Sequence, residues 1–339
     1  MTSTADSKSV STQDESGGSR GGSGSSARTP LHRRVTPVAA AYIAVVLVGV
    51  VGQILHPGFL GSAHLSTMIA LASVLGIVAA GQTVVIITGG IDLSVASILA
   101  FAEVMTPYWV QGDSSRWPVL LLIIIVAAVL GMINTIGITV FGIQPMIMTL
   151  GVGAAVDGAV LVLTAGSSTG LPPELLTRTM GHNGWFSGLL VGWIVVSIVT
   201  YLVLHRSTFG RRVFAIGTSA RAARLAGIRA WSTLLGVYIF AAVMAAVAGI
   251  ALAGYTGSGD FGIGSTYLFP SVGAVVIGGT SILGGRGGYV GTIAGVLILS
   301  TIDSILTLSD IAAAGRQIAQ GLAILVILVL YARERRLRQ

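Results

Sequence analysis

The sequence has 339 residues, of which 53% are hydrophobic and only 9% are charged. Soluble domains carry about 25% charged residues, so this composition excludes an ordinary soluble fold and indicates that lipid surrounds most of the chain. Cysteine is absent, which excludes disulfides, and the net charge of +7 comes without interleaved aromatic residues, which argues against nucleic-acid binding.

The N-terminal segment differs in composition from the rest of the chain. Residues 1–35 are rich in Ser, Gly and Thr and nearly free of large apolar side chains, so we expect a disordered cytoplasmic tail. We expect no secretory signal, because no short apolar stretch precedes a small-residue cleavage site. Residues 36–331 form the predicted membrane domain, and residues 332–339 form a basic cytoplasmic tail.

A helix needs about 20 apolar residues to cross the hydrocarbon core of a bilayer. By that measure the sequence predicts an all-α transmembrane bundle of about ten spans. The expected spans are Val38–Leu55, Met68–Ile87, Leu93–Val110, Pro118–Val140, Met146–Thr164, Phe186–Leu204, Leu234–Gly254, Phe269–Leu283, Gly291–Leu308 and Ile318–Tyr331. Two groups of five spans start on opposite sides of the membrane, so a five-plus-five repeat would have to be inverted, as is common in transporters.

The basic residues predict the orientation of these spans. With the N-terminus inside, 16 of the 19 Lys and Arg residues lie on the inner side. Arg116 and Arg178 fall outside, and Arg316 lies within or beside the last span. Cytoplasmic loops carry such an excess of positive charge, so we expect both termini in the cytoplasm.

The clearest local feature follows the second span, where the pair Gly89 and Gly90 precedes Asp92 and Ser94. The glycines interrupt the helix, and Asp92 suits the N-cap of the third span. One interpretation is a cap at a tight turn. The other is a pathway or gate, because irregular backbone at membrane depth is tolerated only where it is buried in protein or faces water.

A second interruption runs from Gly278 to Gly288 and includes Gly279, Thr280 and Ser281. Its glycine density suggests a phosphate-binding loop, but no Lys followed by Ser or Thr is present and no strand precedes it. We therefore expect close helix packing around a pore here, and no nucleotide hydrolysis by this chain.

Residues 206–232 form the longest polar segment between expected spans on the inner side. Thr218 or Ser219 can cap a short helix rich in Ala, Arg and Leu, and Gly227 can end it. Such a helix either lies on anionic lipid or docks a soluble partner.

Four stretches together make residues 68–331 resemble the permease subunits of monosaccharide ABC importers, the ribose, xylose and arabinose group. The four are the Gly-Gly-Ile-Asp-Leu-Ser motif at 89–94, residues 144–151, residues 209–212 with 222–228, and residues 274–281 with 284–287. The resemblance implies a permease in the bacterial inner membrane that is not itself an enzyme. It also implies cytoplasmic ABC ATPase subunits that use ATP and Mg, a periplasmic or lipid-anchored sugar-binding protein, and a second permease copy or paralogue.

The resemblance also suggests roles for individual residues. The expected ATPase-coupling residues are Arg211, Arg212, Ala222, Ala223, Arg224 and Gly227. The expected pathway or gate residues are Gly89, Gly90, Asp92, Ser94, Gln144, Pro145, Thr149, Gly279, Thr280 and Ser281. We expect the chain to bind no metal and no cofactor.

Charged side chains within membrane spans are costly and usually face a bundle interior or water. Asp303 and Arg316 lie on consecutive spans near the outer side, where they can pair. Glu103 and Asp157 have no obvious basic partner, and they can accept hydrogen bonds either from sugar hydroxyls or from neighbouring helices.

Two classes of transporter are compatible with these features. The first is the permease subunit of an ATP-driven monosaccharide importer. The second is an ion-coupled secondary transporter of a small polar solute, with Glu103, Asp157 or Asp303 as the proton or sodium site, but this class gives no reason for the cytoplasmic helix. An intramembrane enzyme is not expected, because the sequence has no His cluster and no nucleophile–base pair.

Overall fold

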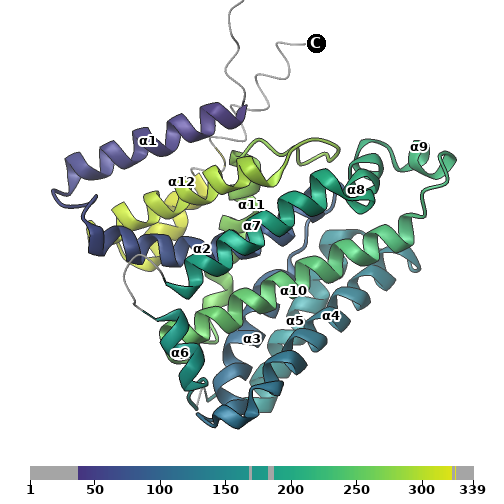
Figure 1. Cartoon of the computed structure of the whole chain (residues 1–339). Helices are drawn as coiled ribbons and strands as arrows, with labels where there is room; N and C mark the ends of the chain where they lie inside the picture. The colour runs from purple at the N-terminus through teal and green to yellow at the C-terminus, as the bar shows by residue number, and fades with distance from the viewer. Residues whose placement is uncertain (1–36, 168–169, 182–186, 323–324, 326–339) are drawn as a thin grey trace, which may run out of the picture. The chain divides into compact units, whose positions relative to one another are not determined.

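The computed structural model describes residues 37–167, 170–181, 187–322 and 325, and all regular secondary structure in them is helical (Figure 1). The predicted tails at 1–35 and 332–339, and the end of the expected tenth span, lie outside the described residues.

The helices follow one another along the chain with short connections. They are α1 (Pro37–Leu55), α2 (Ser62–Ile87), α3 (Ser94–Val110), the 3₁₀ turn η1 (Ser114–Arg116), α4 (Pro118–Thr139), α5 (Pro145–Thr164), α6 (Glu174–Met180), α7 (Gly188–Arg206), α8 (Thr208–Thr218), α9 (Ala220–Leu225), α10 (Ala230–Thr256), α11 (Ile263–Ile277) and α12 (Tyr289–Leu308). Residues 313–322 are also helical.

Seven helices of the described residues are long and apolar enough to cross a membrane: α1, α2, α4, α5, α7, α10 and α12. The shorter apolar helices α3 and α11 lie where the third and eighth spans were expected. Together they form a polytopic helical bundle of the predicted class.

Apolar side chains cover the outside of this bundle. On α1, Val46, Leu47 and Ile54 are 65%, 60% and 73% exposed. Contiguous apolar surface of this kind is unfavourable in water and is expected where lipid is the solvent. The outer helices therefore face acyl chains, whereas α3 and the part of α2 from Ala72 to Ile87 lie in the interior.

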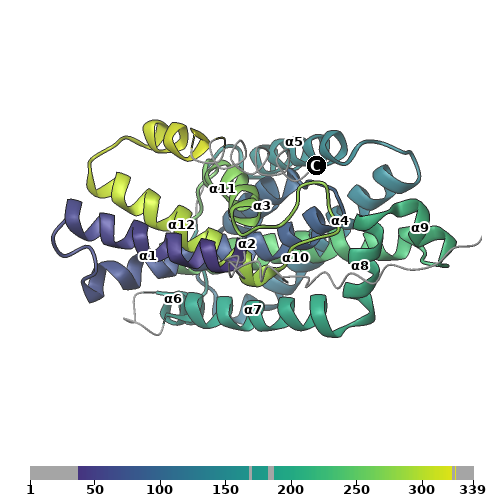
Figure 2. The same cartoon turned by 90° about the horizontal axis from the view of Figure 1, so that it is seen from above.

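The centre of the bundle is α10, which packs against α2, α3 and α4 (Figure 1). Glycines make these contacts possible. A Cβ at Gly81 would lie 2.7 Å from the Cα of Ala241, and Cβ atoms at Gly131 and Gly249 would overlap backbone of the facing helix. Small residues allow such close approach of helix backbones in membranes. Figure 2 shows α7 on one side of these central helices and α5 on the other.

The structure differs from the expected spans in several places: α2 begins at Ser62 rather than Met68, and the last helix begins at residue 313 rather than 318. The eighth span was expected at Phe269–Leu283, but α11 ends at Ile277 and the chain turns at Gly278 and Gly279. Gly279 has φ +88°, a left-handed value that a helix cannot continue through, so the apolar residues beyond it belong to a loop. The polar segment before the sixth span contains a helix, α6, that the hydropathy pattern does not indicate.

Candidate functional site

The loop between α2 and α3 is held together by a buried carboxylate. Asp92 is fully buried, and its Oδ1 accepts hydrogen bonds from the backbone amide of Ser94 at 2.8 Å and from the Ser94 hydroxyl at 2.6 Å. Leu93, not Asp92, occupies the N-cap position of α3. Asp92 therefore lies one residue before the N-cap rather than at it, although its carboxylate accepts the amide of the first helical residue.

Neighbouring helices complete this site. The side-chain amide of Asn134 on α4 donates to the Ser94 hydroxyl at 2.9 Å. The hydroxyl of Thr149 on α5 accepts from the amide of Leu93 at 3.0 Å and donates to the carbonyl of Pro145 at 2.9 Å. The structure thus brings together two of the predicted stretches. Asn134 was not predicted, because a lone Asn in an apolar span does not reveal its partner.

Gly90 lies against α10 in the same site. A Cβ at this position would be 2.8 Å from the hydroxyl of Tyr238. Of the polar atoms in the site, Asp92 Oδ2 and Asn134 Oδ1 are buried without a hydrogen-bond partner. Gln144 belongs to the same stretch as Pro145, but its side chain is exposed and it serves as the N-cap residue of α5.

A second set of contacts joins this loop to the glycine-rich segment before α12 and to α8. The amide of Gly285 donates to the carbonyl of Ile87, the last residue of α2, at 2.9 Å. A Cβ at Gly217 on α8 would overlap this same carbonyl oxygen, and one at Gly284 would lie 2.9 Å from the amide of Gly89. We call these five residues the glycine junction. It leaves no space for side chains between the three segments.

The other residues of the glycine-rich segment hold its own turn. The amide of Ser281 donates to the carbonyl of Arg286 at 3.0 Å, and the amide of Gly288 donates to the Thr280 hydroxyl at 3.3 Å. Gly279 provides the left-handed residue that ends α11. Thr280 is buried, whereas Leu283, Arg286 and Gly287 farther along the segment are exposed.

The segment after α7 contains two helices rather than the one expected. Ser219 separates them, and its hydroxyl caps α9 by accepting from the amide of Ala222 at 3.2 Å. Gly227 has φ +78° and ends α9, with the amide of Ile228 bonded to the carbonyl of Ala223 at 3.0 Å. The predicted cap and stop are both confirmed.

Most of the predicted coupling residues on α8 and α9 are exposed, and one is buried. Ala223 is buried against the bundle. Four predicted coupling residues have exposed side chains: Arg211, Arg212, Ala222 and Arg224. Leu225 at the end of α9 is 85% exposed, a large apolar residue among charged neighbours. The sequence prediction did not single it out, although an apolar residue at the end of a polar helix is a usable signal.

The intramembrane acids have partners at different places. Asp303 pairs with Arg316 at 3.5 Å, as predicted. Asp157 accepts a hydrogen bond from the Ser97 hydroxyl at 2.9 Å, and Glu103 accepts one from the backbone amide of Asp260. Asp157 and Glu103 thus accept hydrogen bonds from neighbouring segments of the chain, as in the second of the two interpretations, in which the donors are neighbouring helices rather than sugar hydroxyls.

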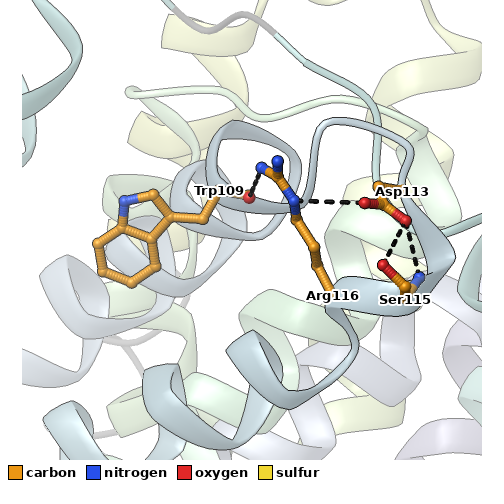
Figure 3. Close-up of polar contacts among 4 residues, drawn as sticks. All are labelled: Trp109, Asp113, Ser115 and Arg116. Carbon is orange, nitrogen blue, oxygen red and sulfur yellow. Dashed lines mark hydrogen bonds and ion pairs between the residues drawn. The ribbon is translucent and has the colours of Figure 1, made fainter.

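The turn between α3 and α4 is fixed by polar contacts (Figure 3). Asp113 Oδ1 accepts from the amide and the hydroxyl of Ser115 at 2.9 and 2.7 Å, and the Arg116 guanidinium lies 3.4 Å from Asp113 Oδ2. Arg116 also donates to the carbonyl of Trp109 at 3.3 Å. The Ser115 hydrogen bonds, with a smaller contribution from Arg116, hold the pKa of Asp113 below its usual value.

These features define a class of protein. A polytopic apolar bundle with broken helices, buried polar loops and a basic segment outside the spans has the construction of a membrane transporter. Buried polar side chains such as Asp92, Asn134 and Thr149 lie inside the bundle near the interruptions, and α8 and α9 expose basic side chains.

The chain belongs to the family described as "Branched-chain amino acid transport system / permease component", which matches residues 64–330. It is 34% identical over 304 residues to the ribose import permease protein RbsC of Bacillus subtilis, covering 88% of this chain and 92% of that protein. It is 32% identical over 247 residues to the autoinducer 2 import system permease protein LsrD of Photorhabdus laumondii, covering 70% and 73%. It is 29% identical over 320 residues to the fructose import permease protein FruG of Bifidobacterium longum, covering 88% and 92%. No solved structure matches the chain.

The predicted resemblance to permeases of sugar import systems is confirmed by these relatives. The chain is a membrane-embedded permease component of a transport system. This membership favours the first of the two predicted transport classes over an ion-coupled carrier.

Proposed function

We propose that this chain is the permease subunit of an importer that carries a monosaccharide across the bacterial cytoplasmic membrane. ATP, with Mg, is hydrolysed by partner ATPase subunits, and a periplasmic or lipid-anchored binding protein delivers the sugar. A second permease, either a copy or a paralogue, completes the translocation unit. The kinship with ribose and fructose import permeases supports the sugar as substrate class.

The glycine junction is the observation that supports a mechanism for coupling the ATPase to the membrane helices. Arg224 and Leu225 of α9 offer charge and apolar surface to a soluble ATPase. Helix α8 connects α9 to the junction, where Gly217 lies against the end of α2. Because there is no space between these backbones, a displacement of α9 and α8 is passed to the loop that contains Asp92. We propose this loop and the glycine-rich segment as the gate.

We also propose ten spans arranged as an inverted repeat. Thr88-Gly89-Gly90-Ile91-Asp92-Leu93-Ser94 is followed 168 positions later by Thr256-Gly257-Ser258-Gly259-Asp260-Phe261-Gly262. In both turns the Asp Oδ1 accepts the amide two residues on at 2.8 Å, and the Gly after Thr has positive φ. The same shift of 168 carries α2, α3, α4 and α5 onto α10, α11, α12 and the helix that begins at 313.

The two copies of the first helix run in opposite directions. Gly81 on α2 lies against Ala241 on α10, and Thr67, earlier on α2, is hydrogen-bonded to Tyr255, later on α10. Antiparallel placement is what an inverted repeat requires. With α8 and α9 in the cytoplasm, both termini are also cytoplasmic, which the excess of basic residues on that side supports.

The proposed function is tested by reconstitution. Proteoliposomes containing this chain, its ATPase and a second permease are supplied with the binding protein outside and ATP at the ATPase side, and uptake of D-ribose and D-fructose is measured. We expect uptake of a monosaccharide that requires ATP and the binding protein. Uptake driven by a proton or sodium gradient in the absence of ATP would contradict the proposal.

The coupling role of α9 has its own test, the substitution Gly227→Leu. A Cβ at Gly227 would meet nothing within 4 Å, but φ +78° disfavours any residue with a side chain by about 1–2 kcal/mol. We expect a variant that inserts normally and hydrolyses ATP with its partner, but transports little sugar. The control is Gly192→Ala, since Gly192 lies within α7 in open space. Normal coupling in Gly227→Leu would argue against docking through α9.

A further inference from the structure

A cavity of about 450 Å³ lies at the end of the bundle opposite to α8 and α9. Its walls come from the first turns of α2, from α11, from the last turns of α12 and from the helical residues 313–322. Pockets that hold small ligands begin at about 300 Å³, so the cavity has room for a solute of the size of one sugar ring.

An ion pair lies on one wall of the cavity. Asp303 and Arg316 are 3.5 Å apart, and their side chains are 42% and 29% exposed, respectively. The amide of Gln320 donates to Asp303 Oδ1 at 2.9 Å, and Arg316 donates to the Thr307 hydroxyl at 3.0 Å. A carboxylate has about four acceptor positions and a guanidinium five donors, so both groups keep unused hydrogen-bonding capacity.

The remaining walls mix polar and apolar groups. The imidazole of His64 is hydrogen-bonded to the Ser304 hydroxyl at 2.8 Å. Tyr267 adds a half-buried aromatic side chain, and Leu75 and Leu299 add apolar surface. Apolar walls with a few convergent donors and acceptors are the usual construction of a small-molecule site.

The region of the first half of the chain that matches the cavity has the same helical arrangement without the polar side chains that line the cavity. The positions 168 residues before Asp303, Ser304, Arg316 and Gln320 are occupied by Thr135, Ile136, Met148 and Val152. Thr135 is fully buried, and Met148 packs so closely on α4 that a Cβ at Gly137 would overlap its sulfur. One region is filled by mostly apolar side chains, whereas its counterpart is hollow and carries an ion pair.

We infer that this cavity is a transit site for a hydroxylated solute of monosaccharide size. Sugar hydroxyls donate to the Asp303 carboxylate and accept from Arg316 and Gln320, which replaces the water that the solute loses on entry. Charged side chains within membrane domains mark substrate pathways by default, and the pair here faces a cavity rather than packed helix. This inference rests on the proposed function, because it takes the solute from it.

The absence of cysteine from the chain makes a direct test possible. Ser304→Cys places a single thiol in the cavity, and Ser309→Cys, at the end of α12 outside the cavity, is the matched control. Each variant is labelled in the assembled transporter with a charged methanethiosulfonate, with and without D-ribose or D-fructose. Ser300→Cys, also in the wall, replaces Ser304→Cys should the latter fail to assemble.

We expect the transported sugar, at about four times its dissociation constant, to slow labelling of Ser304→Cys about fivefold and that of Ser309→Cys not at all. Equal labelling rates with and without sugar in the cavity variant would overturn the inference. Wild-type protein that takes up no sugar with ATP and all partners present would instead contradict the proposed function.

Substitutions of the ion pair separate binding from a purely structural role. We expect Asp303→Asn and Arg316→Gln each to reduce sugar uptake about tenfold, equivalent to about 1.4 kcal/mol, while ATP hydrolysis by the complex continues. The double variant Asp303→Arg with Arg316→Asp keeps an ion pair but moves the carboxylate away from Gln320. Full recovery of uptake in this double variant would show that the pair only joins two helices, and would overturn the inference.

Discussion

The two halves of the bundle share one helical frame but differ in what they enclose. Both contain the same Asp-stabilised turn, at Asp92 between α2 and α3 and at Asp260 between α10 and α11. Asp92 is fully buried among four helices, whereas Asp260 is exposed. The comparison teaches that the turn is a property of the short motif itself, and that the surrounding side chains decide whether it becomes part of a packed gate.

The same contrast holds at the far ends of the two copies. Around Thr135 the first half is closed, and around Asp303 the second half is open. Protein interiors are close-packed unless something keeps a space open, so the cavity in the second half is a feature of its side chains rather than of the frame.

The largest effect is expected from exchanging residues between these two ends. Thr135→Asp places a carboxylate at a fully buried position of α4, where burying an uncompensated charge costs about 3–5 kcal/mol. Asp303→Thr removes a carboxylate from a half-exposed position, where we expect a loss of about 1 kcal/mol. Thermal unfolding in detergent checks both variants, and equal losses would mean that the two ends are not packed differently.

A smaller loss of stability is expected from the glycine junction. A Cβ at Gly217 would overlap the carbonyl oxygen of Ile87 and lie 2.6 Å from the amide of Gly285. Gly217→Ala therefore forces α8 away from the bundle, at a cost of about 3 kcal/mol, the upper end of the range for overpacking. At the corresponding end of α10, a Cβ at Gly257 would meet nothing within 4 Å, so the variant tests what distinguishes the end of α2 from that of α10.

The matched control is Gly192→Ala, which adds the same methyl group to a helix with nothing within 4 Å. We expect its unfolding midpoint to stay at the wild-type value or rise slightly, because Ala is the better helix former. A Gly217→Ala variant as stable as Gly192→Ala would mean that the junction is not tightly packed.

Much of this architecture could be predicted from the sequence, because hydropathy alone identifies long apolar helices. Spans such as Val38–Leu55 and Pro118–Val140 agree with α1 and α4 to within a residue. The pattern was wrong at α11, where apolar residues continue past Gly279 although the backbone turns there. It also missed α6, a seven-residue helix that is too short for a periodic signal.

The candidate site was only partly predictable. The motif around Asp92 was identified from its residue types, but its contact with Gly217 joins segments more than 100 positions apart and depends on backbone packing. The pairing of Asp303 with Arg316 was predicted from their places on consecutive spans, whereas the cavity beside them was not. A cavity is the space that side chains leave, and no local pattern of residues encodes it.

The two Asp-stabilised turns allow a direct comparison of environment. Asp92→Ala removes two hydrogen bonds to a buried carboxylate and leaves the Ser94 amide without that acceptor, at a cost of about 2–3 kcal/mol. Asp260→Ala removes the same backbone bond at an exposed turn, where about 1 kcal/mol is typical of a lost cap. Urea or thermal unfolding in detergent measures the loss of stability in both variants. A larger loss for Asp260→Ala than for Asp92→Ala would contradict the idea that burial makes the turn at Asp92 more important for stability.

The smallest effect is expected at the turn between α3 and α4, where Asp113 is exposed (Figure 3). The Ser115 hydrogen bonds lower its pKa in the folded protein, so its stabilising contribution is present above the unfolded pKa of about 4 and is lost as the pH falls through the lowered value. Asp113→Ala should therefore unfold slightly earlier than wild type at neutral pH, and at the same temperature once Asp113 is protonated. Asp113→Asn retains an acceptor for the Ser115 amide, so its unfolding temperature at neutral pH should lie between those of wild type and Asp113→Ala.

A pH-independent difference in unfolding temperature between wild type and Asp113→Ala would mean that the carboxylate charge does not stabilise this turn. In the second half, the connection between α11 and α12 is bonded to α2 instead, through the amide of Gly285 and the carbonyl of Ile87.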